Sequence, residues 1–233
     1  AGITQALTVN EAFPSVQYTV RTDFLSDSFL HFFVGSEEIT KGYIWVFPRT
    51  ATHMSIGAGF YGCPADQPRV RVLLDRFMQR YVPDAVGEEL ITGCAPITLC
   101  PRQLARLNVV VVGDAARQVN PVTAGGIMNG LEAAELASKA LLRALQHGPK
   151  QLETYSRSWA RTGRLQQKVF CMLKEMLLEM KDQDLVRGFD RATALFSQSV
   201  DRSGPYHLPV VPMIRMMVHY VPKVLRHCHF LLK

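Results

Sequence analysis

The sequence has few cysteines, and they do not form the patterns that mark disulfide frameworks or metal sites. There are five in 233 residues, an odd number, and none belongs to a CxxC pair. We therefore expect reduced thiols, a cytoplasmic location and no metal site. The first residues contain neither a basic segment nor an apolar core, so no signal peptide is recognisable. An initiator methionine is also absent, and we expect the chain to be a segment of a longer protein.

Two further absences narrow the class of protein. No GxGxxG unit lies between a strand and a helix, and no acidic residue follows at the spacing that would bind an adenosine ribose. The pyrophosphate-binding half of a dinucleotide-binding domain is therefore not expected in this chain. The net charge of +6 is a weak indication of an anionic partner, and we expect no nucleic acid. Length and apolar content fit one large domain or two small ones with a real core.

Apolar periodicity predicts an α+β (α/β) fold that combines an antiparallel sheet with helices. A helix is expected over Arg69–Val82, and another from about Gly126 to Gln146, where Gly148 and Pro149 end it. The last third of the chain is predicted to be mainly helical. Short aromatic or β-branched runs predict strands at Val16–Thr22, Phe29–Val34, Tyr43–Phe47, His53–Phe60 and Glu88–Leu99.

A valine run is joined to a glycine-rich turn within residues 108–131. Val109–Val112 form an uninterrupted apolar run, which suits a fully buried strand. A helix that starts near Gly126 would present unpaired backbone N–H groups, and its dipole would favour a negatively charged group there. Gly125 and Gly126 have no β-carbon, so the backbone could approach a flat ring closely. Asp114, at the end of the strand, can accept hydrogen bonds from a sugar-like hydroxyl. An ordinary strand–turn–helix unit has the same spacing, so spacing alone leaves both interpretations open.

The residues of this stretch resemble a known family. Gly113-Asp114-Ala115-Ala116, Asn120-Pro121-Val122-Thr123 and Gly126-Ile127 are similar to the second flavin-contacting motif of the geranylgeranyl reductases, flavoproteins built like para-hydroxybenzoate hydroxylase. The resemblance implies FAD as the cofactor, with Asp114 on its ribityl chain and the backbone of 124–127 at the pyrimidine edge of the isoalloxazine. The implied cofactor-binding residues are Gly113, Asp114, Pro121, Thr123, Ala124, Gly125, Gly126 and Ile127.

A second motif resembles the same family. Residues 42–48, GYIWVFP, and then Gly57-Ala58-Gly59 match its YxWxFP…GxG signature, although Thr40 stands where the family often has proline. The resemblance implies that this strand face lines an isoprenoid pocket next to the flavin. An aromatic lining suits a polyprenyl chain, which has no hydrogen-bonding groups, but the same residues could simply fill a core. The implied substrate-binding residues are Tyr43, Trp45, Phe47, Pro48, Gly57 and Gly59, with the glycines leaving room where side chains would be.

The resemblance also implies a domain organisation. Residues 1–100 would form an antiparallel substrate-binding sheet domain, and residues 101–148 the last strand and helix of an FAD-binding Rossmann-like domain. Residues 149–233 would form a helical region. Within it, 209–233 carries basic and apolar residues on adjacent helical faces and no acidic residue. Such a helix can lie at a membrane surface, which would suit a lipid substrate, or it can pack on its own bundle.

The sequence therefore predicts part of an FAD-dependent reductase that saturates carbon–carbon double bonds of a geranylgeranyl chain. The electron donor, NAD(P)H or a ferredoxin-like protein, is left undetermined. No catalytic acid is assigned, because His53 alone in a strand is more often structural. A flavin hydroxylase of the same fold is one alternative, which Arg117 disfavours because hydroxylases usually carry histidine there. A non-catalytic lipid-binding remnant is the other.

Overall fold

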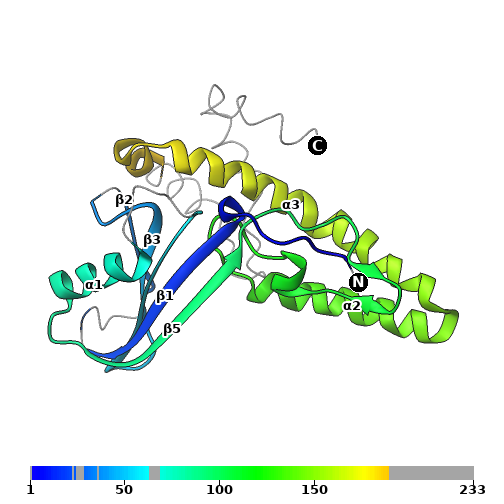
Figure 1. The fold of residues 1–233 in the computed structure, drawn as a ribbon, viewed down its shortest axis with the longest axis horizontal. Helices are drawn as coiled ribbons and strands as arrows, with labels where there is room; N and C mark the ends of the chain where they lie inside the picture. The colour runs from blue at the N-terminus through cyan, green and yellow to red at the C-terminus, as the bar shows by residue number, and fades with distance from the viewer. Residues whose placement is uncertain (1, 23, 25–28, 36, 63–68, 189–233) are drawn as a thin grey trace. The chain divides into compact units, whose positions relative to one another are not determined.

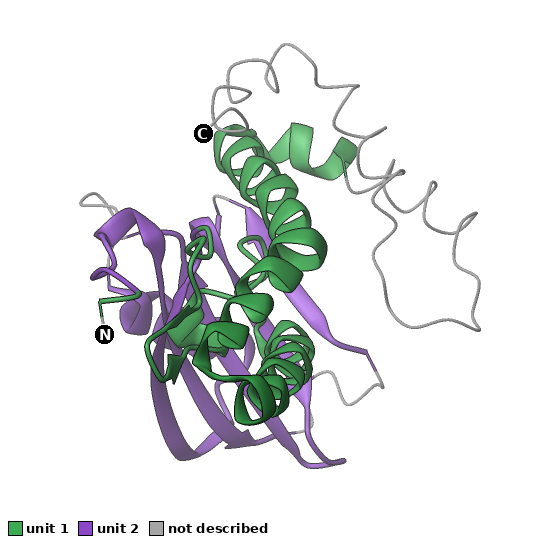
Figure 2. Cartoon of the chain, turned by 90° about the vertical axis from the view of Figure 1, so that its right-hand side faces the viewer, with its two compact units in different colours: residues 1–3, 99–233 green, residues 4–98 purple. Residues whose placement is uncertain are grey.

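The structure is a computed structural model that describes residues 2–22, 24, 29–35, 37–62 and 69–188. The chain divides into two compact units, one of residues Thr4–Thr98 and one of Ala1–Ile3 with Leu99–Lys233 (Figure 2). We call them the sheet unit and the helical unit. Strands and helices are both present, with an antiparallel sheet, as the sequence predicts.

The sheet unit contains five antiparallel strands in the order β2-β3-β4-β1-β5, and Figure 1 shows β1 and β5 side by side. A short 3-10 helix, Val9–Glu11, precedes β1, and helix α1 (Val70–Tyr81) lies between β4 and β5 in the chain. The predicted strands are all present, with ends that differ by a few residues. The strands are β1 (Ala12–Arg21), β2 (His31–Gly35), β3 (Ile39–Pro48), β4 (His53–Phe60) and β5 (Val86–Pro96).

One face of this sheet forms the core with α1. Ile44 and Val46 of β3 are fully buried, and they share a cluster with Leu74 and Phe77 of α1. The ring of Phe77 also packs edge-on against Phe33, with the two centroids 4.9 Å apart. Side chains alternate between the faces of a strand, so Tyr43, Trp45 and Phe47 lie on the opposite face. The aromatic residues of β3 therefore lie outside this core.

The helical unit is built around two long helices, α2 (Ile127–His147) and α3 (Glu153–Glu179). Small residues of α2 pack close to the aromatic side chains of α3, in one cluster that holds Ala133, Ala137, Tyr155 and Trp159. Gly148, at φ 90°, ends α2 as predicted, and a 3-10 turn, Pro149–Leu152, leads into α3. The short strands β6 (Ala105–Arg106) and β7 (Val109–Val110) form an antiparallel pair, followed by the 3-10 turn η2 (Gly113–Ala116).

The prediction that the valine run forms a fully buried strand is wrong. Only Val109 and Val110 are in a strand, and Val109 and Val112 are 44% and 38% exposed. Such a run is buried where a sheet is covered on both faces. Among the described residues, β7 has a ladder only with β6, and Val110 and Val111 are the members of the run that pack on the helix cluster.

Candidate functional site

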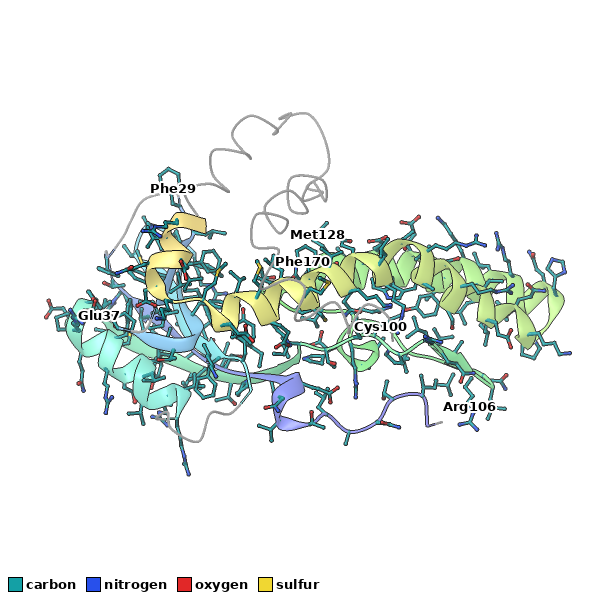
Figure 3. All side chains as sticks on the ribbon, turned by 90° about the horizontal axis from the view of Figure 1, so that it is seen from above. Phe29, Glu37, Cys100, Arg106, Met128 and Phe170 are labelled. Atoms are coloured by element: carbon teal, nitrogen blue, oxygen red, sulfur yellow. The ribbon has the colours of Figure 1, made fainter. Side chains whose placement is uncertain are left out.

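A pocket of about 310 Å³ lies in the helical unit, between the loop that follows η2, the start of α2 and the middle of α3. Figure 3 labels two of its lining residues, Met128 from α2 and Phe170 from α3. Its volume is at the lower end of the range for small-molecule sites. The lining residues are Val119, Asn120, Pro121, Thr123, Gly125, Gly126, Ile127, Met128, Asn129, Trp159, Gly163, Gln166, Gln167 and Phe170.

Most of the cofactor-binding residues predicted from the sequence meet at this pocket. Five of the eight line it: Pro121, Thr123, Gly125, Gly126 and Ile127. The structure places Asp114 beside them, because a β-carbon built on Gly126 would lie 3.0 Å from Asp114 Oδ1. Gly113 and Ala124 are the neighbours of these residues in the chain. The eight predicted cofactor-binding residues therefore lie close together in the helical unit.

The loop over the pocket is shaped by the side chain of Asn120. Its Oδ1 accepts hydrogen bonds from the backbone N–H groups of Val122, at 2.9 Å, and Thr123, at 3.3 Å. The backbone N–H of Asn120 donates to the carbonyl oxygen of Gly125 at 2.9 Å. Ala124, which lies between Asn120 and Gly125 in the chain, has φ 52°, a conformation that residues other than glycine rarely adopt. The hydrogen bonds of Asn120 therefore hold a tight turn that delivers the chain to Gly126.

The N-terminus of α2 opens onto the same pocket. Gly126 is the N-cap residue, and no side chain caps the helix. The first backbone N–H groups of a helix have no partner within the helix, and the helix dipole adds partial positive charge there. Ile127, Met128 and Asn129, which carry three of these groups, all line the pocket. This end of α2 is suited to an electron-rich or anionic group.

A buried hydrogen-bonded chain fixes the turn that carries Asp114. Gln118 is fully buried, and its Oε1 accepts from the backbone N–H of Gly113 at 2.8 Å. Its Nε2 donates to Tyr155 Oη at 2.8 Å, and that hydroxyl donates to the carbonyl oxygen of Val111 at 3.1 Å. Burial raises the pKa of Tyr155 to about 12, with the Gln118 hydrogen bond opposing the shift. The phenol therefore stays a neutral donor at ordinary pH.

Cys100 lies next to this region and is chemically quiet. Burial raises the pKa of its thiol to about 12, although Arg164, the Trp159 indole and Arg117 act in the opposite direction. Trp159 Nε1 itself is buried without a hydrogen-bond partner among the described residues, so it faces the thiol without forming a well-directed bond. A thiol that stays protonated is a poor nucleophile. We assign Cys100 no role in catalysis.

In the sheet unit, the residues predicted to bind substrate form part of an aromatic face. Tyr43 and Trp45 have ring centroids 5.7 Å apart, and Trp45 and Phe47 have centroids 6.4 Å apart. Phe13 of β1 stacks on Tyr43 at 5.2 Å, and Phe32 of β2 meets Tyr43 edge-on at 5.8 Å. We call these five residues the aromatic face. Phe32 is 55% exposed, so the face carries apolar surface that the sheet unit does not bury.

The glycines of the second motif lie beneath these rings. A β-carbon on Gly57 would overlap the indole of Trp45, and one on Gly59 would overlap the ring of Phe13. The room that the sequence predicts at these glycines is therefore occupied by the protein's own rings. Pro48 ends β3, where it pairs with Met54 of β4. The glycines let the aromatic side chains lie flat on the sheet and so shape the face indirectly.

His53, the only candidate acid considered from the sequence, is held by polar neighbours at the start of β4. Its Nδ1 lies 3.2 Å from Thr50 Oγ1 and 3.0 Å from Thr52 Oγ1. Its Nε2 lies 3.3 Å from Glu88 Oε1. Both ring nitrogens thus have partners within the sheet unit, which suits a structural histidine. The catalytic acid stays unassigned.

Sequence reasoning missed the contacts that α3 makes at and around the pocket. The sequence patterns assign no site role to Tyr155, Trp159, Gln118 or Gln167. Tyr155 and Gln167 hydrogen bond to backbone groups 44 to 67 positions away in the chain. No local spacing could have revealed partners so distant.

Two further findings concern what the described helices and side chains can do. None of the helices in the described ranges is long and apolar enough to cross a membrane. Within the same ranges, no group of three or more His, Cys, Asp or Glu side chains could hold a metal ion. The basic segment 209–233 lies outside the described residues.

Comparison with known proteins gives similar proteins of one family. The family model of the geranylgeranyl reductase catalytic domain matches residues 12–96, the range from the first residue of β1 to the last of β5. A digeranylgeranylglycerophospholipid reductase of Methanosarcina mazei is 30% identical over 191 residues, which cover 79% of this chain and 47% of that protein. The chain spans about half the length of the curated relatives it matches.

Solved structures agree on the fold. A geranylgeranyl bacteriochlorophyll reductase-like protein from Thermoplasma acidophilum superposes with a TM-score of 0.78 at 22% identity, over 96% of this chain and 56% of that one. The flavin-dependent halogenase CmlS superposes with a TM-score of 0.57 at 14% identity, over 91% of this chain and 45% of that one. The structural neighbours thus include flavin-dependent enzymes. The family model, the curated relatives and the solved reductase-like structure together support a flavoprotein of the geranylgeranyl reductase family.

Proposed function

We propose that the chain is the substrate-binding and flavin-contacting part of an FAD-dependent reductase that saturates double bonds of a geranylgeranyl chain. The observation that carries the proposal is the glycine turn of the helical unit. It brings Gly126 and the uncapped N-terminus of α2 to one pocket, with the Asp114 carboxylate beside Gly126. The names of the curated relatives support an isoprenoid lipid as substrate.

The residues of the pocket fit a flavin ring and its ribityl chain. Side chains at 125 or 126 would fill the space over the turn, and Gly126 has only Asp114 and Val119 as close neighbours there. The N–H groups of 127–129 would stabilise negative charge at one edge of a ring. The Asp114 carboxylate would accept a hydrogen bond from a ribityl hydroxyl. The predicted contacts Gly113, Pro121, Thr123 and Ala124 shape this turn.

When bound, reduced FAD supplies the hydride that an alkene carbon accepts. The chain's own share is positioning. The aromatic face offers apolar contact to a polyprenyl chain, which has no polar groups of its own, and excludes water from it. Tyr43 also has an unreactive hydroxyl in this setting, because burial raises its pKa to about 12. We propose no residue as the proton donor.

A lipid substrate also gives a role to the basic segment 209–233. We propose that it makes peripheral contact with an anionic membrane surface, on the basis of its sequence pattern. The electron donor is left open between NAD(P)H and a ferredoxin-like protein.

The proposal is tested with the 233-residue chain, chemically reduced FAD and a digeranylgeranyl lipid, with mass spectrometry of the lipid. We expect the lipid to gain two hydrogens for each double bond reduced, under anaerobic conditions, and to gain less with Asp114→Ala. Oxygen-dependent addition of one oxygen atom would instead show a hydroxylase. Lipid binding without any change in mass, in a chain that has FAD bound, would show a non-catalytic lipid-binding protein.

A further inference from the structure

Gln167 is a buried amide that hydrogen bonds three backbone groups at once. It lies in the middle of α3 and is 4% exposed. Its Oε1 accepts from the backbone N–H of Cys100 at 2.9 Å. Its Nε2 donates to the carbonyl oxygens of Arg117, at 2.6 Å, and Val119, at 3.2 Å. One side chain of α3 therefore ties the helix to two segments that lie far from it in the sequence.

One of these partners has a strained backbone. Arg117 is in the left-handed region, at φ 57° and ψ 36°, which residues with a β-carbon rarely adopt. Such a conformation persists only where the surroundings hold it in place. The N–H of Arg117 donates to the carbonyl oxygen of Asp114, at 2.9 Å, and closes η2. Gln167 binds the carbonyl of the same residue, so it fixes the end of the turn that presents Asp114.

The other partner leads directly to the glycine turn. Val119 precedes Asn120, whose backbone N–H bonds Gly125, and Val119 Cγ2 would lie 3.4 Å from a β-carbon on Gly126. Holding the Val119 carbonyl therefore holds the base of the loop. In the sequence, Asp114 precedes the segment 117–119 and Gly126 follows it. Gln167 binds the backbone carbonyls at both ends of that segment.

Helix α3 is packed against α2 two turns before Gln167. Trp159 of α3 is 2% exposed and shares a buried cluster with Ala133 and Ala137 of α2. Gly163 of the same helix leaves room for the Trp159 indole, because a β-carbon there would overlap the ring. This packing fixes the part of α3 from which the Gln167 amide reaches its partners.

We infer that Gln167 is the positioning residue that sets the distance between Asp114 and the Gly125–Gly126 backbone, and so tunes the pocket for a flavin. The inference rests on the proposed function for the identity of the ligand. Gln167 restricts the backbone conformation of the strained segment 117–119. It acts through backbone carbonyl groups and does not contact the reacting atoms.

The test uses the full 233-residue chain and three variants. Gln167→Glu keeps the shape and the acceptor but loses both donors, since a carboxylate cannot bond two carbonyl oxygens. Gln167→Met removes the polar groups without adding charge. Gln146→Glu, on the exposed surface of α2, makes the same chemical change as the first variant away from the pocket. Amide hydrogen exchange of the segment 113–126 is measured without ligand, and riboflavin binding is measured by quenching of its fluorescence.

We expect both Gln167 variants to exchange faster in 113–126, and Gln167→Met also at the Cys100 amide, which loses its acceptor. Both should bind riboflavin about tenfold more weakly, while the Gln146 variant matches the parent chain. Unchanged exchange in 113–126 would overturn the inference, as would faster exchange with unchanged riboflavin binding. Faster exchange throughout the helical unit would also overturn it, by showing a general stabilising role. A parent chain that does not bind riboflavin would instead contradict the proposed function, and the exchange measurement would still judge the role of Gln167 in the loop.

Discussion

The indole of Trp45 crosses Gly57 to reach a residue on the strand beyond. Trp45 pairs with Gly57 across β3 and β4, and Gly57 pairs with Gln17 across β4 and β1. Trp45 Nε1 donates to Gln17 Oε1 at 3.1 Å, so the ring lies over the glycine between them. A β-carbon at 57 would overlap the ring atoms. The first glycine of the GxG motif is therefore needed by the tryptophan of the YxWxFP motif.

This relationship predicts the effect of Gly57→Ala. The methyl group would displace the indole and break its hydrogen bond to Gln17, at a cost of about 1–3 kcal/mol in the free energy of unfolding. Urea denaturation monitored by circular dichroism measures the change. Gly87→Ala on β5 is the matched control, because a β-carbon there meets nothing within 4 Å. Equal destabilisation by the two substitutions would show that the indole does not depend on Gly57.

A second prediction concerns Gly126 at the pocket. In Gly126→Ala the new β-carbon would lie 3.0 Å from Asp114 Oδ1 and 3.4 Å from Val119 Cγ2, so the turn must shift. We expect riboflavin affinity to fall by about tenfold, measured by fluorescence quenching. Gly130→Ala, where nothing lies within 4 Å, should leave affinity unchanged and stabilise α2 by up to about 1 kcal/mol. Equal affinities of the two variants would argue against a ligand over Gly126.

Local patterns predicted the elements that local forces determine. The alternation of Tyr43, Trp45 and Phe47 predicted one shared strand face, and the structure puts the rings of all three in contact along it. The turn before Gly126 and the stop at Gly148 predicted both ends of α2. In these cases the deciding interactions lie within a few residues of each other, so the sequence contains them.

The parts that the sequence did not predict depend on distant neighbours. The burial of Val109–Val112 depends on which strands flank it and which helices cover it, and a valine run contains no information on either. Gln167 looks like an ordinary polar residue on a helix, yet its partners include Cys100, 67 positions earlier. The space at Gly57 was expected to hold a ligand, because spacing shows that a side chain is missing but not which ring fills the gap.

A third prediction follows from the buried phenol of Tyr43. Burial raises its pKa from 10.0 to about 12, so between these values the unfolded chain has lost a proton that the folded chain keeps. Stability from this group is therefore complete below pH 10 and is lost as the pH rises toward 12, by roughly 2–3 kcal/mol in total. Urea denaturation at about pH 9 and about pH 11 should show a smaller loss for Tyr43→Phe than for the parent chain. The same loss in both would place the titrating group elsewhere, for instance at Tyr155.

The fourth prediction separates the two parts of a flavin. Asp114 is proposed to bind the ribityl chain, whereas the backbone at Gly125 and Gly126 is proposed to face the ring. Lumiflavin has the ring without the ribityl chain, and riboflavin has both. Loss of a hydrogen bond to a charged carboxylate costs about 1.5–3 kcal/mol, so Asp114→Ala should weaken riboflavin by about tenfold or more.

Lumiflavin affinity should change by less than about twofold in the same variant, because no contact to the ring is removed. Fluorescence quenching of both ligands by the parent chain and by Asp114→Ala provides the four affinities that are needed. Gly126→Ala serves as the counterpart, since a shift of the turn should weaken both ligands alike. Equal weakening of both ligands by Asp114→Ala would contradict a contact between the carboxylate and the ribityl chain. The carboxylate would then act by shaping the turn at Gly126, where a β-carbon would lie 3.0 Å from Asp114 Oδ1.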